Sequence, residues 1–205
     1  MKRYLPLLLL TFCSSSAYAV PFTEIDDAGE LLSSAQETVG SGSLTSINAS
    51  LINLADSVAN TIDDIDLYKI FISDTDVFSA TFAADPNGID DAWLYLFNSN
   101  GEEVAFNDDR DPGVDFLPQF DAGVISGLAS AHYYLGVGLY GTEASFTSGS
   151  LSSWTRDPDP FQSGGYTLSL TGTQFSSSPV PAPAPLALLA LGLLGIGLSK
   201  RRKTI

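Results

Sequence analysis

Carboxylate and amide side chains stand at several points of the chain where strands are expected to begin or end. Ca²⁺ takes about six to eight oxygen ligands of this kind, so it is a candidate cofactor. Two of these side chains, on Asp64 and Asp66, are two residues apart and would leave an extended segment on one face. The candidate ligands are Asp64, Asp66, Asp90, Asp91, Asn107, Asp108 and Asp109.

A predicted β-hairpin would bring most of these ligands together. Asn100-Gly101 is a strong hairpin signal between two apolar runs. A hairpin centred there places positions 93 and 108 near the same end, with residues 90–91 beside residues 107–109. The alternative is that these Asp and Asn side chains serve turns, where they bond their own backbone. The sequence has no D-x-D-x-D-G loop, so the calcium prediction rests on this clustering and on the acidic charge.

The sequence lacks the residue arrangements on which common catalytic mechanisms depend. His132 is the only histidine, and it stands beside Tyr133 at the start of an expected strand, where we expect a packing role. Cys13 is the only cysteine, and no G-x-S-x-G or H-E-x-x-H motif occurs. Paired carboxylates could cleave glycosides, but 24 acidic residues make any such pair uninformative. We therefore expect no enzymatic activity.

Aromatic residues offer a different kind of site. Trp93 and Trp154 are both interpreted first as core or edge aromatics. Trp154 lies in residues 142–165, a stretch rich in Ser, Gly and Pro that we interpret as a surface excursion. It is therefore the better candidate for ligand contact, together with the Tyr-rich strand 133–140.

Short β-strands are the elements that must position these residues. Residues 28–36 could form one short helix, and residues 43–52 alternate loosely, with Leu44 and Leu51 expected to point inward. Six clearer segments are rich in β-branched and aromatic residues and are bounded by turn residues. They are residues 67–73, 77–83, 92–98, 103–106, 133–140 and 166–171. Short strands without helical crossovers predict an all-β, antiparallel β-sandwich.

Charge is distributed very unevenly along the 205 residues. The formal net charge is −15, yet six of the nine basic residues lie within a few residues of the two termini. Between the terminal segments, Lys69, Arg110 and Arg156 face all 24 acids, a net charge of −21. Such a body repels nucleic acid and anionic lipid, which are bound through Lys and Arg clusters. High ionic strength or bound divalent cations should help it fold.

The N-terminus has the layout of a signal peptide. Lys2 and Arg3 form a charged region that is followed by the apolar run 5–12. Ala17 and Ala19 then form an A-x-A cleavage site. Cleavage by signal peptidase after Ala19 would remove the only cysteine, so we expect an exported protein without disulfides.

The C-terminus combines a Pro/Ala hinge, an apolar run and a basic end. The thirteen residues 186–198 would form a helix of about 20 Å, short of the roughly 30 Å hydrocarbon core. Such a helix suits transient membrane insertion before processing, with the basic end cytoplasmic. An ordinary C-terminal membrane tail is the alternative.

Together the two termini resemble the PEP-CTERM class of exported bacterial proteins. The resemblance lies in Pro181-Ala182-Pro183, the apolar run, and a basic end that includes Arg201 and Arg202. It implies recognition and cleavage by an exosortase, a membrane transpeptidase. One departure is Ala182, which stands where that class has Glu.

The body resembles a second family, the bacterial pre-peptidase C-terminal (PPC) domain. The similarity covers residues 62–171 and follows the order of the segments D-I-D-L-Y (64–68), D-A-W-L-Y-L (91–96), N-D-D (107–109) and G-Y-T-L-S-L (165–170). It implies a jelly-roll-like β-sandwich. The chain departs from the family at Ala131-His132-Tyr133-Tyr134, where Gly usually precedes the Tyr, and it has no attached peptidase.

These observations predict five regions and one main function. The regions are a signal peptide (1–19), an N-terminal segment (20–60), a PPC-like β-sandwich (61–173), a linker (174–179) and a sorting signal with a short apolar helix (180–205). We expect an exported, non-enzymatic protein of the cell envelope or extracellular matrix that is associated with polysaccharide. The alternative is a carbohydrate- or protein-binding module.

Overall fold

The computed structural model describes residues 19–51, 65–86, 88–156 and 163–177. Within these ranges the protein is all-β and contains no helix. Its strands are β1 (Val20–Thr23), β2 (Gln36–Glu37), β3 (Leu44–Leu51), β4 (Ile65–Ile72), β5 (Ser79–Ala84), β6 (Ala92–Phe97), β7 (Glu103–Asn107), β8 (Gln119–Phe120), β9 (Ala131–Leu139), β10 (Thr142–Thr147), β11 (Ser150–Arg156), β12 (Gly164–Thr171) and β13 (Thr173–Phe175).

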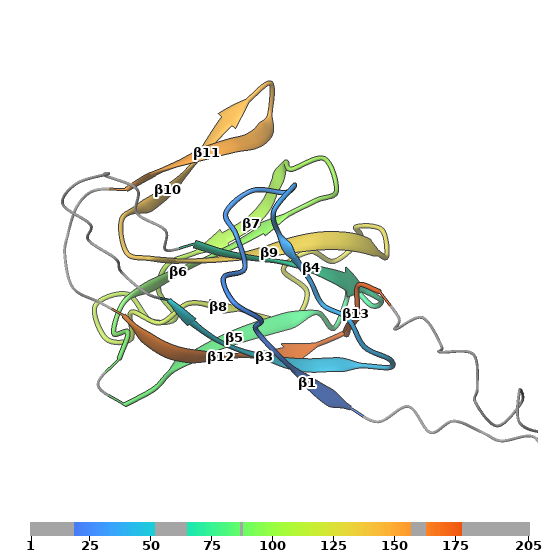
Figure 1. Cartoon of the computed structure of the whole chain (residues 1–205), viewed down its shortest axis with the longest axis horizontal. Helices are drawn as coiled ribbons and strands as arrows, with labels where there is room; N and C mark the ends of the chain where they lie inside the picture. Colours follow the sequence, from blue (N-terminus) through green and yellow to red (C-terminus); the bar gives the residue numbers. More distant parts are fainter. Residues whose placement is uncertain (1–18, 52–64, 87, 157–162, 178–205) are drawn as a thin grey trace, which may run out of the picture.

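These strands form two main sheets that face each other and a separate hairpin (Figure 1). One sheet has the order β1-β3-β12-β5-β8, and the other has the order β13-β4-β9-β6-β7 with β2 beside β4. Strands β10 and β11 pair only with each other and lie outside the second sheet. The pairings are antiparallel except for β1 with β3 and β2 with β4, which are parallel.

The main core lies between the two sheets. Alternate residues of β4, β9 and β12 point inward, because successive side chains of a strand leave on opposite faces. Tyr68, Leu135 and Leu168 are examples, and each is fully buried. Burying each side chain of this size contributes about 1.5–3 kcal/mol. Leu44 and Leu51 of β3 point into this core, as the sequence predicts.

A second, smaller core lies on the outer face of the β4-β9-β6 sheet. Its buried residues are Leu67, Tyr95, Phe97 and Leu151. The first three come from outward positions of β4 and β6, and Leu151 comes from the β10–β11 hairpin. The hairpin therefore covers part of the sheet as a third layer.

The hairpin is held against the turn between β6 and β7. Leu151 N donates a hydrogen bond to Gly101 O over 2.9 Å, and Ser150 Oγ donates one to Asn100 O over 2.7 Å. Gly101 has a φ of +80°, and a Cβ there would lie 2.6 Å from Ser150 Oγ. Only glycine meets both conditions without strain.

Two sequence-based expectations about local structure are wrong. Residues 28–36 form turns and the start of β2 instead of a helix, because Gly29 has a φ of +67° and Ser34 Oγ accepts a hydrogen bond from Leu31 N. Residues 142–165 are not a plain surface excursion, since residues 142–156 form the β10–β11 hairpin.

The six predicted strands all exist, with ends shifted by up to two residues. None of the described residues lies in a helix that could span a membrane. The apolar helix expected within residues 180–205 falls outside the described residues, and the jelly-roll topology stays a prediction.

Candidate functional site

Three aromatic side chains share the outer face of β6 and β7. Trp93 and Tyr95 are alternate residues of β6, and Phe106 of β7 pairs with Tyr95 across the hairpin. The ring centroid of Phe106 lies 4.7 Å from that of Tyr95 and 5.3 Å from that of Trp93. The alternation of β6 and the register of the hairpin therefore place the three rings together.

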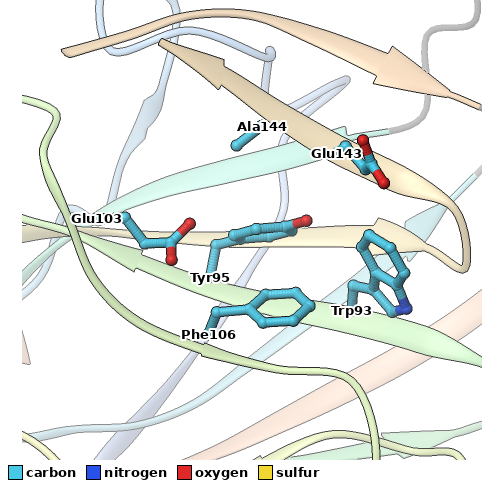
Figure 2. Close-up of a pocket in the computed structure, with 6 residues that line it drawn as sticks. All are labelled: Trp93, Tyr95, Glu103, Phe106, Glu143 and Ala144. Carbon is cyan, nitrogen blue, oxygen red and sulfur yellow. The ribbon is translucent and has the colours of Figure 1, made fainter. Parts of the chain in front are cut away.

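These rings line an open hollow of about 290 Å³ between β6–β7 and strand β10 (Figure 2). We call this hollow the aromatic groove. It is lined by Trp93, Tyr95, Glu103, Phe106, Glu143 and Ala144. Phe106 is 42% exposed, so part of its ring is accessible to a ligand. Tyr140 is also exposed and meets Trp93 edge-on at 5.7 Å.

Two carboxylates complete the lining. Glu103 and Glu143 lie on opposite sides of the Tyr95 ring (Figure 2). Neither forms an ion pair with any residue that the structure describes; the ion pairs there are Lys69–Glu37 and Arg110–Asp115. The groove is therefore negatively charged as well as aromatic.

The titration behaviour of the lining reflects both properties. Burial raises the pKa of Glu103 above its ordinary value. Burial also raises the pKa of Tyr95, and the charges of Glu103 and Glu143 add to this rise. Tyr95 Oη donates a 2.6 Å hydrogen bond to Thr142 O, which fixes the ring against the hairpin.

Trp154, the predicted ligand contact, is half-buried and does not line the groove. Its ring packs edge-on against Tyr95 at 5.1 Å and Phe97 at 5.9 Å. Its Nε1 donates a 2.7 Å hydrogen bond to Glu30 O. Trp154 thus joins the hairpin to the sheet and to the N-terminal segment.

The strand 133–140, the other predicted contact, contributes less than expected. Tyr133 faces the main core, where it is buried, and its Oη donates to Ala129 O over 2.8 Å. Tyr140 contacts Trp93 edge-on but does not itself line the groove.

The acidic residues at the open end of the β6–β7 hairpin lie near one another. Leu94 pairs with Asn107, the register that the Asn100-Gly101 turn predicts. Burial raises the pKa of Asp91 to about 6, and the charges of Asp109, Asp90 and Asp108 add to the rise. The predicted proximity of residues 90–91 to residues 108–109 is therefore present.

Two side chains of this group form hydrogen bonds to backbone N–H groups. Asp108 Oδ1 accepts a hydrogen bond from Asp109 N, and Asn107 Oδ1 accepts one from Gln119 N. Among the described residues, no group of three or more His, Cys, Asp or Glu is arranged to hold a metal ion. Calcium binding stays a prediction.

Asp66 lies apart from that group, in the main core. Its Oδ2 accepts a 2.5 Å hydrogen bond from Tyr166 Oη, which also contacts Tyr68 Oη at 3.0 Å. Tyr68 Oη in turn donates to Glu24 Oε1 over 2.9 Å. Burial, followed by the nearby Glu24 charge, raises the pKa of Asp66 to about 8. Asp64, its predicted partner, lies outside the described residues.

His132 occupies a packing position at the start of β9. Its Nε2 lies 3.0 Å from Ser176 O, and its ring meets Phe71 edge-on at 5.2 Å. His132 therefore links β9 to β4 and to the segment that follows β13.

The predicted processing residues lie mostly outside the described ranges. Ala17, Pro181, Ala182, Pro183, Arg201 and Arg202 are all outside them. Ala19 is described and directly precedes β1, whose Val20 N donates to Ser43 O over 3.3 Å. Cleavage after Ala19 would therefore leave Val20, the first residue of β1, as the new N-terminus.

Sequence reasoning missed Tyr95, Glu103, Phe106 and Glu143 as site residues. The register of the predicted hairpin could have identified one pair, because it places Phe106 opposite Tyr95. Glu143 gave no signal, because its place in the lining depends on how the β10–β11 hairpin folds over the sheet.

Comparison with known proteins finds one family signature. Residues 179–203 match the PEP-CTERM protein-sorting motif. The chain therefore carries the signal of an exported protein that is sorted by an exosortase, with the cell envelope or surface as its destination. No curated protein matches the chain.

Proposed function

We propose that this protein is a non-enzymatic component of the cell envelope or extracellular matrix that binds polysaccharide in its aromatic groove. The observation that carries the proposal is the exposed Phe106 ring and the partly exposed Trp93 ring, which pack around the buried Tyr95 beside two carboxylates. Sugar rings have apolar C–H faces that pack on aromatic rings, and their hydroxyls donate to carboxylates.

Several observations support this proposal. The sorting motif directs the protein to the outside of the cell, where extracellular polysaccharide is available. The groove is open, so a long polymer can cross it without a chain end entering. The aromatic rings are fixed by mutual packing and by the bond from Tyr95 to Thr142, so little ordering is needed on binding.

Binding of the full-length chain to immobilised neutral, acidic and amino polysaccharides tests the proposal. We expect at least one class to retain the protein, and Phe106→Ala to weaken that retention by about two- to tenfold, since one such ring contact is worth about 0.5–1.5 kcal/mol. Phe116→Ala is the matched control, because Phe116 is 44% exposed and does not line the groove. Failure of every polysaccharide to retain the folded parent protein would contradict the proposal.

A further inference from the structure

The aromatic groove combines two properties that select for one ligand chemistry. Aromatic faces attract both apolar C–H groups and cations, and the attraction for cations strengthens when water is displaced. The carboxylates of Glu103 and Glu143 add charge attraction on both sides of Tyr95 (Figure 2). A ligand with an apolar face and a positive charge satisfies both properties.

Charge excludes the other main classes of polysaccharide as preferred ligands. An acidic sugar would bring its carboxylate or sulfate close to Glu103 and Glu143, in a body with a net charge of −21. A neutral sugar would use the aromatic rings but would gain no charge attraction. A sugar with a free, protonated amine gains from both, through charge-assisted hydrogen bonds to the carboxylates.

The arrangement of the lining also favours a polymer over a single cation. The groove is open, and its two carboxylates stand on opposite sides of the aromatic floor. These two carboxylates therefore offer positions for more than one ammonium group. Successive units of an amino-sugar chain would present a repeated charge and a continuous apolar face.

Building on the proposed function, we propose that the groove binds a polysaccharide of amino sugars with free amines. The sugar faces pack on Trp93 and Phe106, which Tyr95 supports from beneath, while ammonium groups pair with Glu103 and Glu143.

Calorimetric titration of the full-length chain with three hexamers tests this inference: glucosamine, N-acetylglucosamine and glucose. We expect the glucosamine hexamer to bind at least tenfold more tightly than its N-acetylated counterpart. Raising the salt concentration should reduce this preference, because it screens the ion pairs.

Charge variants separate a specific site from general attraction. Glu103→Gln and Glu143→Gln should each reduce the preference for free amines several-fold while leaving the melting temperature unchanged. Asp121→Asn removes one charge outside the groove lining and should leave the preference intact. Equal losses in all three variants, or equally tight binding of poly-lysine, would overturn the inference.

The outcomes also distinguish this inference from the proposed function. Equal affinity for the three hexamers, with all three weakened by Phe106→Ala, overturns the amino-sugar inference and leaves polysaccharide binding in place. No binding by any hexamer or polysaccharide overturns both.

Discussion

Asp66 shows how one buried carboxyl can connect the two sheets. It belongs to β4 in one sheet, and its hydrogen-bond donor Tyr166 belongs to β12 in the other. Tyr68 and Glu24 extend the network to the segment after β1. A neutral carboxyl costs far less to bury than a charged one, and burial accordingly raises the pKa of Asp66 to about 8.

Stability should therefore decrease as the pH rises from about 4 to about 8. In this range the folded protein keeps the Asp66 proton, whereas the unfolded chain releases it near pH 4. The stabilising contribution is complete below pH 4 and is lost as the pH rises through 8. Thermal melts at pH 5 and pH 8.5 should show a midpoint at least about 5 °C higher at pH 5, since each kcal/mol shifts a domain of this size by about 2–4 °C.

Asp66→Asn is the control for this pH dependence. The amide keeps an oxygen acceptor for Tyr166 but cannot ionise. The variant should lose most of the difference between the two midpoints, while the general repulsion among surface acids remains. An unchanged difference would mean that Asp66 does not carry the effect.

At the scale of elements, the β10–β11 hairpin determines whether the groove exists. Its strand β10 supplies Glu143 and Ala144 to the lining, and its strand β11 supplies Leu151 to the second core. Trp154 joins the hairpin to the N-terminal segment through Glu30 O. The groove is thus formed by a layer that is held on by few contacts.

Trp154→Ala should lower the free energy of unfolding by about 2–3 kcal/mol, because it leaves a cavity beside Tyr95 and Phe97. Denaturant unfolding measures this change. Trp154→Phe keeps a ring there and loses the hydrogen bond to Glu30 O, so it should cost only about 1 kcal/mol. A Trp154→Ala protein with full stability but no glycan binding would instead assign Trp154 to ligand contact.

The strands of the main core could be predicted from the sequence because their side chains alternate clearly. In β4 and β9, large apolar or aromatic residues recur at every second position, and the Asn100-Gly101 turn fixes the register of β6 and β7. Strands β10 and β11 could not be recognised, because Ser and Thr fill most of their positions. Their few apolar residues pack against Tyr95 and Phe97 of β6, a contact that the local sequence pattern does not indicate. The groove depends on that long-range packing, so the sequence predicted the β6–β7 hairpin but not the groove that β10 completes.

At the scale of the whole molecule, opposite charges are separated between body and tail. The body carries −21, and the last six residues carry Lys200, Arg201, Arg202 and Lys203. Processing at the sorting motif would therefore remove most of the positive charge that remains after export.

Mass spectrometry of the exported protein should find a chain that begins at Val20 and lacks Ile205. Ala182→Glu restores the acidic residue of the motif and should speed the conversion of precursor to product. Neutralising the basic end with Arg201→Ala and Arg202→Ala should slow this conversion. Fewer positive charges would then keep the end of the tail on the cytoplasmic side of the membrane. An intact Ile205 on the mature protein would show that the tail is a permanent anchor.

The order of strands in the β13-β4-β9-β6-β7 sheet has a consequence for how the protein is oriented. Strand β13 ends at Phe175 on one edge, and the sorting motif begins only four residues further along the chain, at residue 179. The groove lies at the opposite edge, on β6 and β7. Adjacent strands are about 4.8 Å apart, so the sheet is a spacer of roughly 19 Å between tail and groove. While an exosortase holds the tail, the groove would therefore lie at the edge of this sheet that is farthest from the attachment point at Phe175.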